Sequence, residues 1–134
     1  MAAIKTIYLV DDDEDWRLLV KEAVNEAGIP VKVIEADNGQ SLFKILQREV
    51  KNAIVILDVN MPVMNGLETL EALRASSHWG SLPIFLVSTS DSYDLALTAI
   101  RKGPTRFVTK PVHFNEFVSL VKELCTSCDA IAAR

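Results

Sequence analysis

The chain has 134 residues, of which 49% are hydrophobic and 24% are charged, a composition typical of one soluble globular domain. Its net charge of −4 and its scattered lysines and arginines argue against nucleic-acid binding, which depends on clustered basic side chains. No apolar run approaches the roughly 20 residues that span a bilayer, and residues 1–6 lack the apolar core of a signal peptide. We therefore expect one domain over residues 1–134, without a membrane segment and located in the cytoplasm.

Five short apolar runs predict β-strands, and the amphipathic segments that follow them predict helices. The strands are expected at residues 7–10, 31–36, 53–57, 83–87 and 106–109, and the helices at residues 16–27, 41–49, 66–74, 95–100 and 115–124. We expect a folded core over about residues 6–125 and a C-terminal tail over residues 126–134. Cys125 and Cys128 follow the last helix, which favours two free thiols over a redox or zinc site.

The regular alternation of strands and helices predicts a parallel sheet with helices on both faces. The first, third and fourth strands are wholly apolar and are expected in the centre of the sheet, whereas the second and fifth contain charged residues and are expected at its edges. The predicted fold is therefore α/β, a flavodoxin-like (βα)5 doubly wound sheet with strand order 2-1-3-4-5. Ligands of such sheets bind beyond the carboxyl ends of the strands.

Polar side chains follow four of these strands. Asp11 and Asp12 end the first, Asp58 the third, Ser88 the fourth and Lys110 the fifth. Each of these residues alone could simply end a strand or cap a helix. Because the first and third strands are predicted neighbours, however, three carboxylates would share one site, and a cation such as magnesium would relieve their repulsion. A hydroxyl, an ammonium group and a divalent cation around one carboxylate suit the binding of a phosphoryl group.

Four motifs at these strand ends make the chain resemble the receiver domain of bacterial two-component response regulators over nearly all of its length. The motifs are Leu9-Val10-Asp11-Asp12, Leu57-Asp58-Val59-Asn60-Met61-Pro62 with Asn65-Gly66-Leu67-Glu68, Pro83-Ile84 through Val87-Ser88, and Phe107-Val108-Thr109-Lys110-Pro111. The resemblance implies that Asp58 accepts a phosphoryl group from a histidine kinase or phosphotransfer protein. The phosphorylated domain would then present an altered surface to a downstream protein.

The resemblance also implies a metal site for Mg²⁺ or Mn²⁺. Its ligands would be the carboxylates of Asp12 and Asp58 and the backbone carbonyl of Asn60, with Asp11 acting through water. The implied role of the metal is to neutralise the incoming phosphoryl group and to relieve the repulsion within the carboxylate cluster.

Three further residues receive roles from the resemblance. Ser88 would move toward the new phosphoryl group, Lys110 would pair with it, and Phe107 would act as the aromatic switch residue. In the family the Lys110–Pro111 peptide bond would be cis, which the sequence cannot show.

Three positions depart from the family pattern. Thr89 replaces a small residue beside the phosphorylation site and is expected to slow access to it, and Pro104 replaces the usual small residue after Gly103. Phe107 lacks the hydroxyl group that Tyr would supply. None of these changes removes a residue needed for phosphotransfer.

The preferred interpretation is a stand-alone receiver domain, a regulatory phosphoacceptor rather than an enzyme with its own substrate. One alternative is a receiver-like scaffold that binds its partners constitutively. Another is an aspartate-nucleophile phosphatase, because Asp11-Asp12-Asp13 resembles the Asp-x-Asp start of haloacid-dehalogenase-type enzymes. Asp15 stands where such enzymes have Thr or Val, and the chain has no room for a cap domain. The cognate kinase, the target, the phosphoryl lifetime and the oligomeric state stay open.

Overall fold

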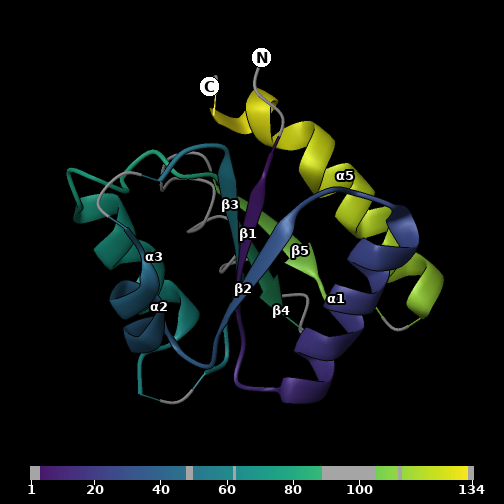
Figure 1. Cartoon of the computed structure of the whole chain (residues 1–134). Helices are drawn as coiled ribbons and strands as arrows, with labels where there is room; N and C mark the ends of the chain where they lie inside the picture. The colour runs from purple at the N-terminus through teal and green to yellow at the C-terminus, as the bar shows by residue number, and fades with distance from the viewer. Residues whose placement is uncertain (1–3, 48–49, 62, 89–104, 112, 133–134) are drawn as a thin grey trace.

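The computed structural model describes residues 4–47, 50–61, 63–88, 105–111 and 113–132. The described strands are β1 (Thr6–Val10), β2 (Lys32–Ala36), β3 (Ala53–Asp58), β4 (Ile84–Ser88) and β5 (Thr105–Thr109), and the described helices are α1 (Glu14–Ala27), α2 (Gly39–Ile45), α3 (Gly66–Ala75) and α5 (Phe114–Ala132) (Figure 1). The helix predicted at residues 95–100, Thr89 and Pro104 lie outside the described residues.

The five strands form one parallel sheet in the order β2-β1-β3-β4-β5, which confirms the predicted flavodoxin-like topology. Strands β3 and β4 are buried at every residue and β1 at all but its first, whereas β2 and β5 contain exposed residues. The apolar runs therefore lie in the centre and the mixed runs at the edges, because a central strand of a parallel sheet is covered on both faces.

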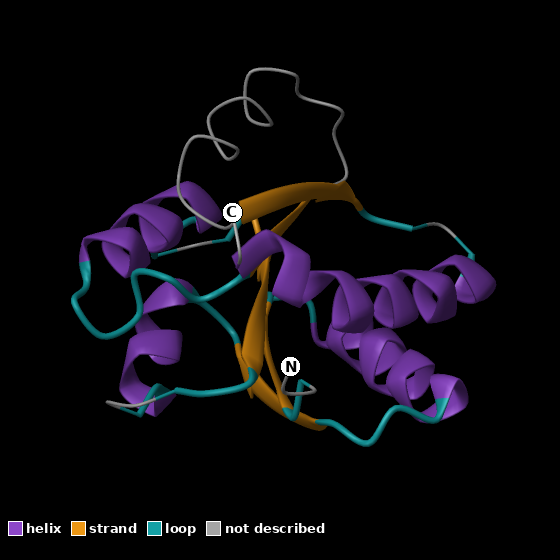
Figure 2. Cartoon of the chain, turned by 90° about the horizontal axis from the view of Figure 1, so that it is seen from above, coloured by secondary structure: helices purple, strands orange, loops and turns teal. Residues whose placement is uncertain are grey.

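The described helices cover the two faces of the sheet, α1 with α5 on one face and α2 with α3 on the other (Figure 1 and Figure 2). Successive strand residues point to opposite faces, so each strand contributes to two separate apolar cores. The core under α1 and α5 contains Ile7, Leu9, Ile54, Ile56, Phe85 and Val87 from the strands. The core under α2 and α3 contains Tyr8, Val10, Val55, Leu57, Ile84 and Leu86.

Two helices end several residues away from their predicted C-terminal ends. Helix α2 ends at Ile45 rather than near residue 49, because Leu46 adopts an extended conformation with ψ of 127° and turns into the core. Helix α5 continues to Ala132, past the predicted end near Leu124, so residues 126–132 of the predicted C-terminal tail are helical. No Gly or Pro occurs between residues 114 and 132 to stop this helix.

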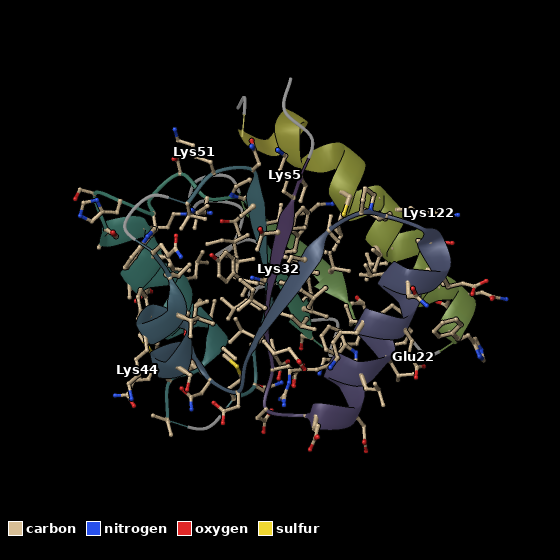
Figure 3. All side chains as sticks on the ribbon, viewed as in Figure 1. Lys5, Glu22, Lys32, Lys44, Lys51 and Lys122 are labelled. Carbon is tan, nitrogen blue, oxygen red and sulfur yellow. The ribbon has the colours of Figure 1, made fainter. Side chains whose placement is uncertain are left out.

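The lysine side chains labelled in Figure 3 come from separate elements and loops of the described part of the chain: Lys5, Lys32, Lys44, Lys51 and Lys122. All are exposed. Within the described part of the chain, no helix combines the length and apolar character needed to cross a bilayer.

Candidate functional site

The carboxyl ends of β1 and β3 bring the three predicted acids together. Asp11 follows β1 directly, Asp58 is the last residue of β3, and the register pairs Val10 with Leu57. Carboxylate oxygens of Asp11, Asp12 and Asp58 all lie within 4.8 Å of one another. Asp11 has no exposed surface and Asp58 is 4% exposed, whereas Asp12 faces solvent. The cluster is therefore open to solvent at Asp12 and closed behind it.

Lys110 reaches the same cluster from the end of β5. Its Nζ lies 2.9 Å from Asp11 Oδ2 and 3.5 Å from Asp58 Oδ1. The Lys110 backbone N–H donates a hydrogen bond of 2.8 Å to the carbonyl oxygen of Ser88, the fully buried last residue of β4. The structure thus places all four predicted strand ends at one edge of the sheet.

Burial and charge shift the pKa values in this cluster. Burial raises the pKa of Asp58 to about 6, and the negative charge of Asp11 adds to this, while Lys110 and the Asn60 backbone N–H oppose it. Burial also raises the pKa of Asp11. For Lys110, burial favours the neutral amine, but the carboxylates of Asp11 and Asp58 outweigh it and raise its pKa. The positive charge of Lys110 therefore offsets only part of the cost of burying the negative charges of Asp11 and Asp58.

The carboxylate cluster can hold a divalent cation. Hard cations take oxygen ligands, and Asp11, Asp12 and Asp58 each offer a carboxylate oxygen within 4.8 Å of the others. The raised pKa of Asp58 has the repulsion from Asp11 among its causes, and a bound cation would relieve that repulsion. Asn60 lies two residues after Asp58 and is exposed, between the buried residues Val59 and Met61. The use of its carbonyl oxygen as a ligand stays a prediction.

The Lys110–Pro111 bond differs from the expectation. The described residues contain no cis peptide bond, so the bond is trans and the expected cis form is wrong for this structure. The trans form is the more stable one for a bond preceding proline. In this conformation Lys110 already reaches both carboxylates, because the hydrogen bond from its N–H to Ser88 fixes its backbone beside β4.

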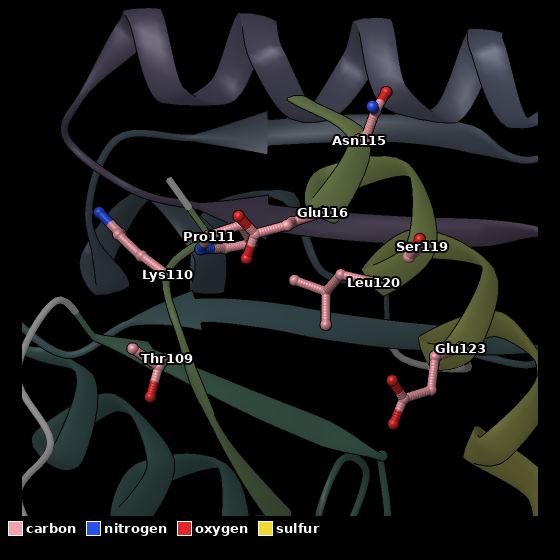
Figure 4. A pocket seen from close by; sticks show the side chains of 8 residues that line it. All are labelled: Thr109, Lys110, Pro111, Asn115, Glu116, Ser119, Leu120 and Glu123. Carbon is pink, nitrogen blue, oxygen red and sulfur yellow. The ribbon is translucent and has the colours of Figure 1, made fainter. Parts of the chain in front are cut away.

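A pocket of about 540 Å³ lies beside the site, between the end of β5 and helix α5. It is lined by Thr109, Lys110, Pro111, Asn115, Glu116, Ser119, Leu120 and Glu123. Figure 4 shows the Lys110 side chain extending away from the α5 residues that form the rest of the lining. The ammonium group of Lys110 therefore belongs to the acid cluster.

Phe107 is half-buried and packs against the core under α2 and α3, and its role as a switch stays a prediction.

The loop between β3 and α3 is held by Gly66. The Gly66 N–H donates a 2.9 Å hydrogen bond to the carbonyl oxygen of Val59. A Cβ atom on residue 66 would lie 2.7 Å from Val59 Cα and would also collide with the carbonyl oxygen of Asp58. Only glycine therefore allows α3 to begin this close to the backbone that carries Asp58.

Replacing Gly66 by Ala is expected to lower the free energy of unfolding by about 1 to 3 kcal/mol, because backbone atoms must move to admit the methyl group. Urea unfolding followed by circular dichroism measures the change. Glu22→Ala, an exposed position on helix α1, serves as the control and is expected to stay within about 0.5 kcal/mol of the wild type. Equal stability of the two variants would contradict the close approach at Gly66.

Two residues of α1 also contact this site, and sequence reasoning missed both. Arg17 donates hydrogen bonds to the Asp11 carbonyl oxygen at 2.6 Å and to Glu35 Oε1 at 3.0 Å. The ring of Trp16 lies 4.7 Å from Lys110 Nζ. The available signal was proximity in sequence, since Trp16 and Arg17 follow Asp11 by five and six positions. Trp16 begins the helix predicted at residues 16–27, and that pattern alone gave it no role at the site.

Comparisons with known proteins agree with the fold. A family model described as the response regulator receiver domain matches residues 7–122. The chain belongs to this family. Receiver domains are regulatory phosphoacceptors, so membership is consistent with a role in phosphorelay signalling.

Named relatives of this receiver domain include chemotaxis proteins. CheY1 of Helicobacter pylori is 29% identical over 105 residues, which are 78% of this chain and 84% of that protein. A CheY homologue of Campylobacter jejuni is 30% identical over 105 residues, 78% of this chain and 80% of that protein. The solved structure of Vibrio cholerae CheY4 is similar with a TM-score of 0.75 and 27% identity, covering 90% of this chain and 98% of that one.

Proposed function

We propose that this receiver domain accepts a phosphoryl group on Asp58, with Mg²⁺ or Mn²⁺ bound, from a histidine kinase or phosphotransfer protein. The observation that carries the proposal is the position of Lys110, whose Nζ lies 2.9 Å from Asp11 and 3.5 Å from Asp58 beside a cluster of three acids. Phosphorylation then switches a surface that binds a downstream protein. The domain acts as a regulatory phosphoacceptor in this scheme.

The reaction is a displacement at phosphorus. A carboxylate oxygen of Asp58 forms the new P–O bond, while the bond from phosphorus to the donor breaks and its electron pair leaves with the donor atom. For a phosphohistidine donor the leaving group is the imidazole nitrogen, and the product on Asp58 is an acyl phosphate. The ionised carboxylate is the effective nucleophile, and a bound cation would favour this form by relieving the repulsion from Asp11 that helps to raise the pKa of Asp58.

The chain's own residues arrange the charges around this step. Asp11, Asp12, Asp58 and the carbonyl oxygen of Asn60 would hold the cation, which when bound neutralises negative charge on the phosphoryl oxygens. Lys110 supplies an ammonium group at the same edge of the sheet, and Ser88 supplies a hydroxyl group from the end of β4. Together these groups favour the charge distribution of phosphoryl transfer.

Phosphorylation changes the charge that Lys110 faces. A phosphoryl group carries roughly −1.5 to −2 charges and three acceptor oxygens, and it extends beyond the carboxylate to which it is attached. Lys110 and Ser88 are expected to move toward it. Because the Lys110 N–H donates a hydrogen bond to the Ser88 carbonyl oxygen, this movement involves both β4 and β5. It shifts an existing equilibrium between two conformations of the domain that present different surfaces. Phe107 on β5 is the side chain that changes position in this switch.

Intact mass spectrometry of the full chain tests the proposal directly. Incubation with a small acyl phosphate and excess Mg²⁺ is expected to add one phosphoryl group, which hydroxylamine removes because it is an acyl phosphate. Chelation of the metal is expected to prevent the addition. Failure to add any phosphoryl group at saturating donor and Mg²⁺ would reject the proposal. Partner capture that is equally strong with and without beryllofluoride would favour the scaffold alternative.

A further inference from the structure

Trp16 occupies a fixed position behind Lys110. It lies in the first turn of α1, is 6% exposed, and packs against Phe117 of α5 with ring centroids 6.0 Å apart. Its indole N–H is buried and has no hydrogen-bond partner among the described residues. Apolar packing between α1 and α5, rather than a hydrogen bond of the indole, therefore sets the position of the ring.

The face of this ring contacts the ammonium group of Lys110. Lys110 Nζ lies 4.7 Å from the centre of the Trp16 ring, within the range of a cation–π interaction. The Lys110 side chain is only 13% exposed, so little water competes for its charge. The ammonium group consequently has the indole and the carboxylates of Asp11 and Asp58 as neighbours.

Lysine needs such support more than most side chains. Its ammonium group is a point charge on a flexible four-carbon stem, and holding it in one place costs side-chain entropy. Asp11 and Asp58 attract Lys110, but a carboxylate that gains a phosphoryl group or a metal no longer attracts it in the same way. The Trp16 ring is neutral and is fixed by α5, so its attraction for Lys110 persists through the reaction.

We propose that Trp16 is a positioning residue for phosphoryl transfer, whose indole face holds the Lys110 ammonium group beside Asp58 where the phosphoryl group arrives. This inference rests on the proposed function of Asp58. Trp16 touches Lys110 and not the donor. Its loss should therefore lower the rate of transfer at saturating donor, while the donor concentration that gives half of that rate stays the same.

The contact itself is tested without any phosphoryl donor. In a Trp79→Phe background Trp16 is the only tryptophan, so the emission spectrum reports on its surroundings alone. Lys110→Met removes the positive charge over the ring and keeps an unbranched stem. A change in the intensity or the wavelength of emission is expected. An identical spectrum with and without the ammonium group would overturn the proposal, because the two side chains would then not be in contact.

The positioning role is tested by transfer rates from a small acyl phosphate at excess Mg²⁺. Trp16→Leu is expected to lower the saturating rate by about three- to tenfold, the effect of a largely desolvated cation–π contact. Trp16→Phe, which keeps an aromatic face, is expected to recover most of the rate. Val24→Ala is the control, since it removes buried apolar volume from the same core about two helical turns along α1 from Trp16, and it is expected to stay within about twofold of the wild type.

The outcomes separate this inference from the proposed function. Equal rate losses in Trp16→Leu and Val24→Ala would show that Trp16 matters only for packing, and would overturn the inference while Asp58 remained the acceptor. A wild-type chain that takes up no phosphoryl group would overturn the proposed function and the positioning role with it. Thermal unfolding of each variant gives the temperature range in which all are folded, and the rates are compared there.

Discussion

Replacing Asp58 by Asn is expected to abolish phosphorylation of this receiver domain by small acyl phosphates and by a phosphorylated donor protein. The amide has nearly the shape of the carboxylate but lacks its negative charge and nucleophilic oxygen, so the site keeps its packing and loses its reactive group. Asp58 is buried at the end of β3 and its neighbours are set by the sheet, which favours a local effect of the substitution. The amount of phosphoryl group per chain is measured by intact mass.

Asp37→Asn is the matched control for this experiment. Asp37 also follows a strand of the same sheet, β2, but it is exposed, and its carboxylate accepts hydrogen bonds from Asn38 and Ser41 within its own turn. This variant is expected to be phosphorylated at the wild-type level. Phosphorylation that persists in Asp58→Asn would move the acceptor to another residue, with the exposed Asp12 as the first to examine.

The arrangement of the acid cluster was predictable because it follows from the order of the strands and does not depend on how individual helices pack. Once β1 and β3 are neighbours in a parallel sheet, residues that directly follow them must meet, and Asp11 and Asp58 do. The contact between Trp16 and Lys110 depends instead on how α1 sits against α5 and β5. The amphipathic pattern of residues 16–27 predicts a helix but does not say which side chain lies on the ring of Trp16.

Two wrong predictions, the end of α5 and the isomer of the Lys110–Pro111 bond, also concern features that sequence patterns alone do not determine. The end of a helix that lacks Gly or Pro depends on tertiary packing and capping, so α5 could not be bounded from its apolar stripe and continues to Ala132. The isomer of the Lys110–Pro111 bond was taken from family resemblance, and no local sequence rule distinguishes the two forms. In the structure the trans form already brings Lys110 to the carboxylates of Asp11 and Asp58.

In the absence of divalent cations, Asp58 is expected to make the folded protein less stable as pH rises from about 4 to 7. Burial and the charge of Asp11 raise the pKa of Asp58 from 3.8 to about 6, so the folded chain retains a proton that the unfolded chain has lost. The resulting stabilisation is fully present below pH 3.8 and is lost as pH rises through 6. Because one pKa unit corresponds to about 1.36 kcal/mol, the loss is at most about 3 kcal/mol.

Other groups do not obscure this change. Burial raises the pKa of Asp11 as well, so its contribution has the same direction. The pKa of Glu35 is lowered by its hydrogen bond to Lys21 and its contacts with Arg17, so its contribution is present above pH 4.5 and is lost as pH falls. The difference between wild type and Asp58→Asn isolates Asp58. In urea unfolding with a chelator present, this difference is expected to shift by about 2 to 3 kcal/mol in favour of the variant between pH 4 and 7.

At neutral pH, Mg²⁺ is expected to offset the loss of stability that the ionised carboxylate of Asp58 causes in the wild type. The cation binds the ionised carboxylates and competes with protons, so added Mg²⁺ is expected to raise the unfolding temperature of the wild type at pH 7.5 and to have little effect at pH 5. Asp58→Asn, with one carboxylate fewer, is expected to respond more weakly at both pH values. A wild type whose stability is independent of both pH and Mg²⁺ would contradict the charge balance described for Asp11, Asp58 and Lys110, because two buried carboxylates facing one ammonium group cannot all be ionised without cost.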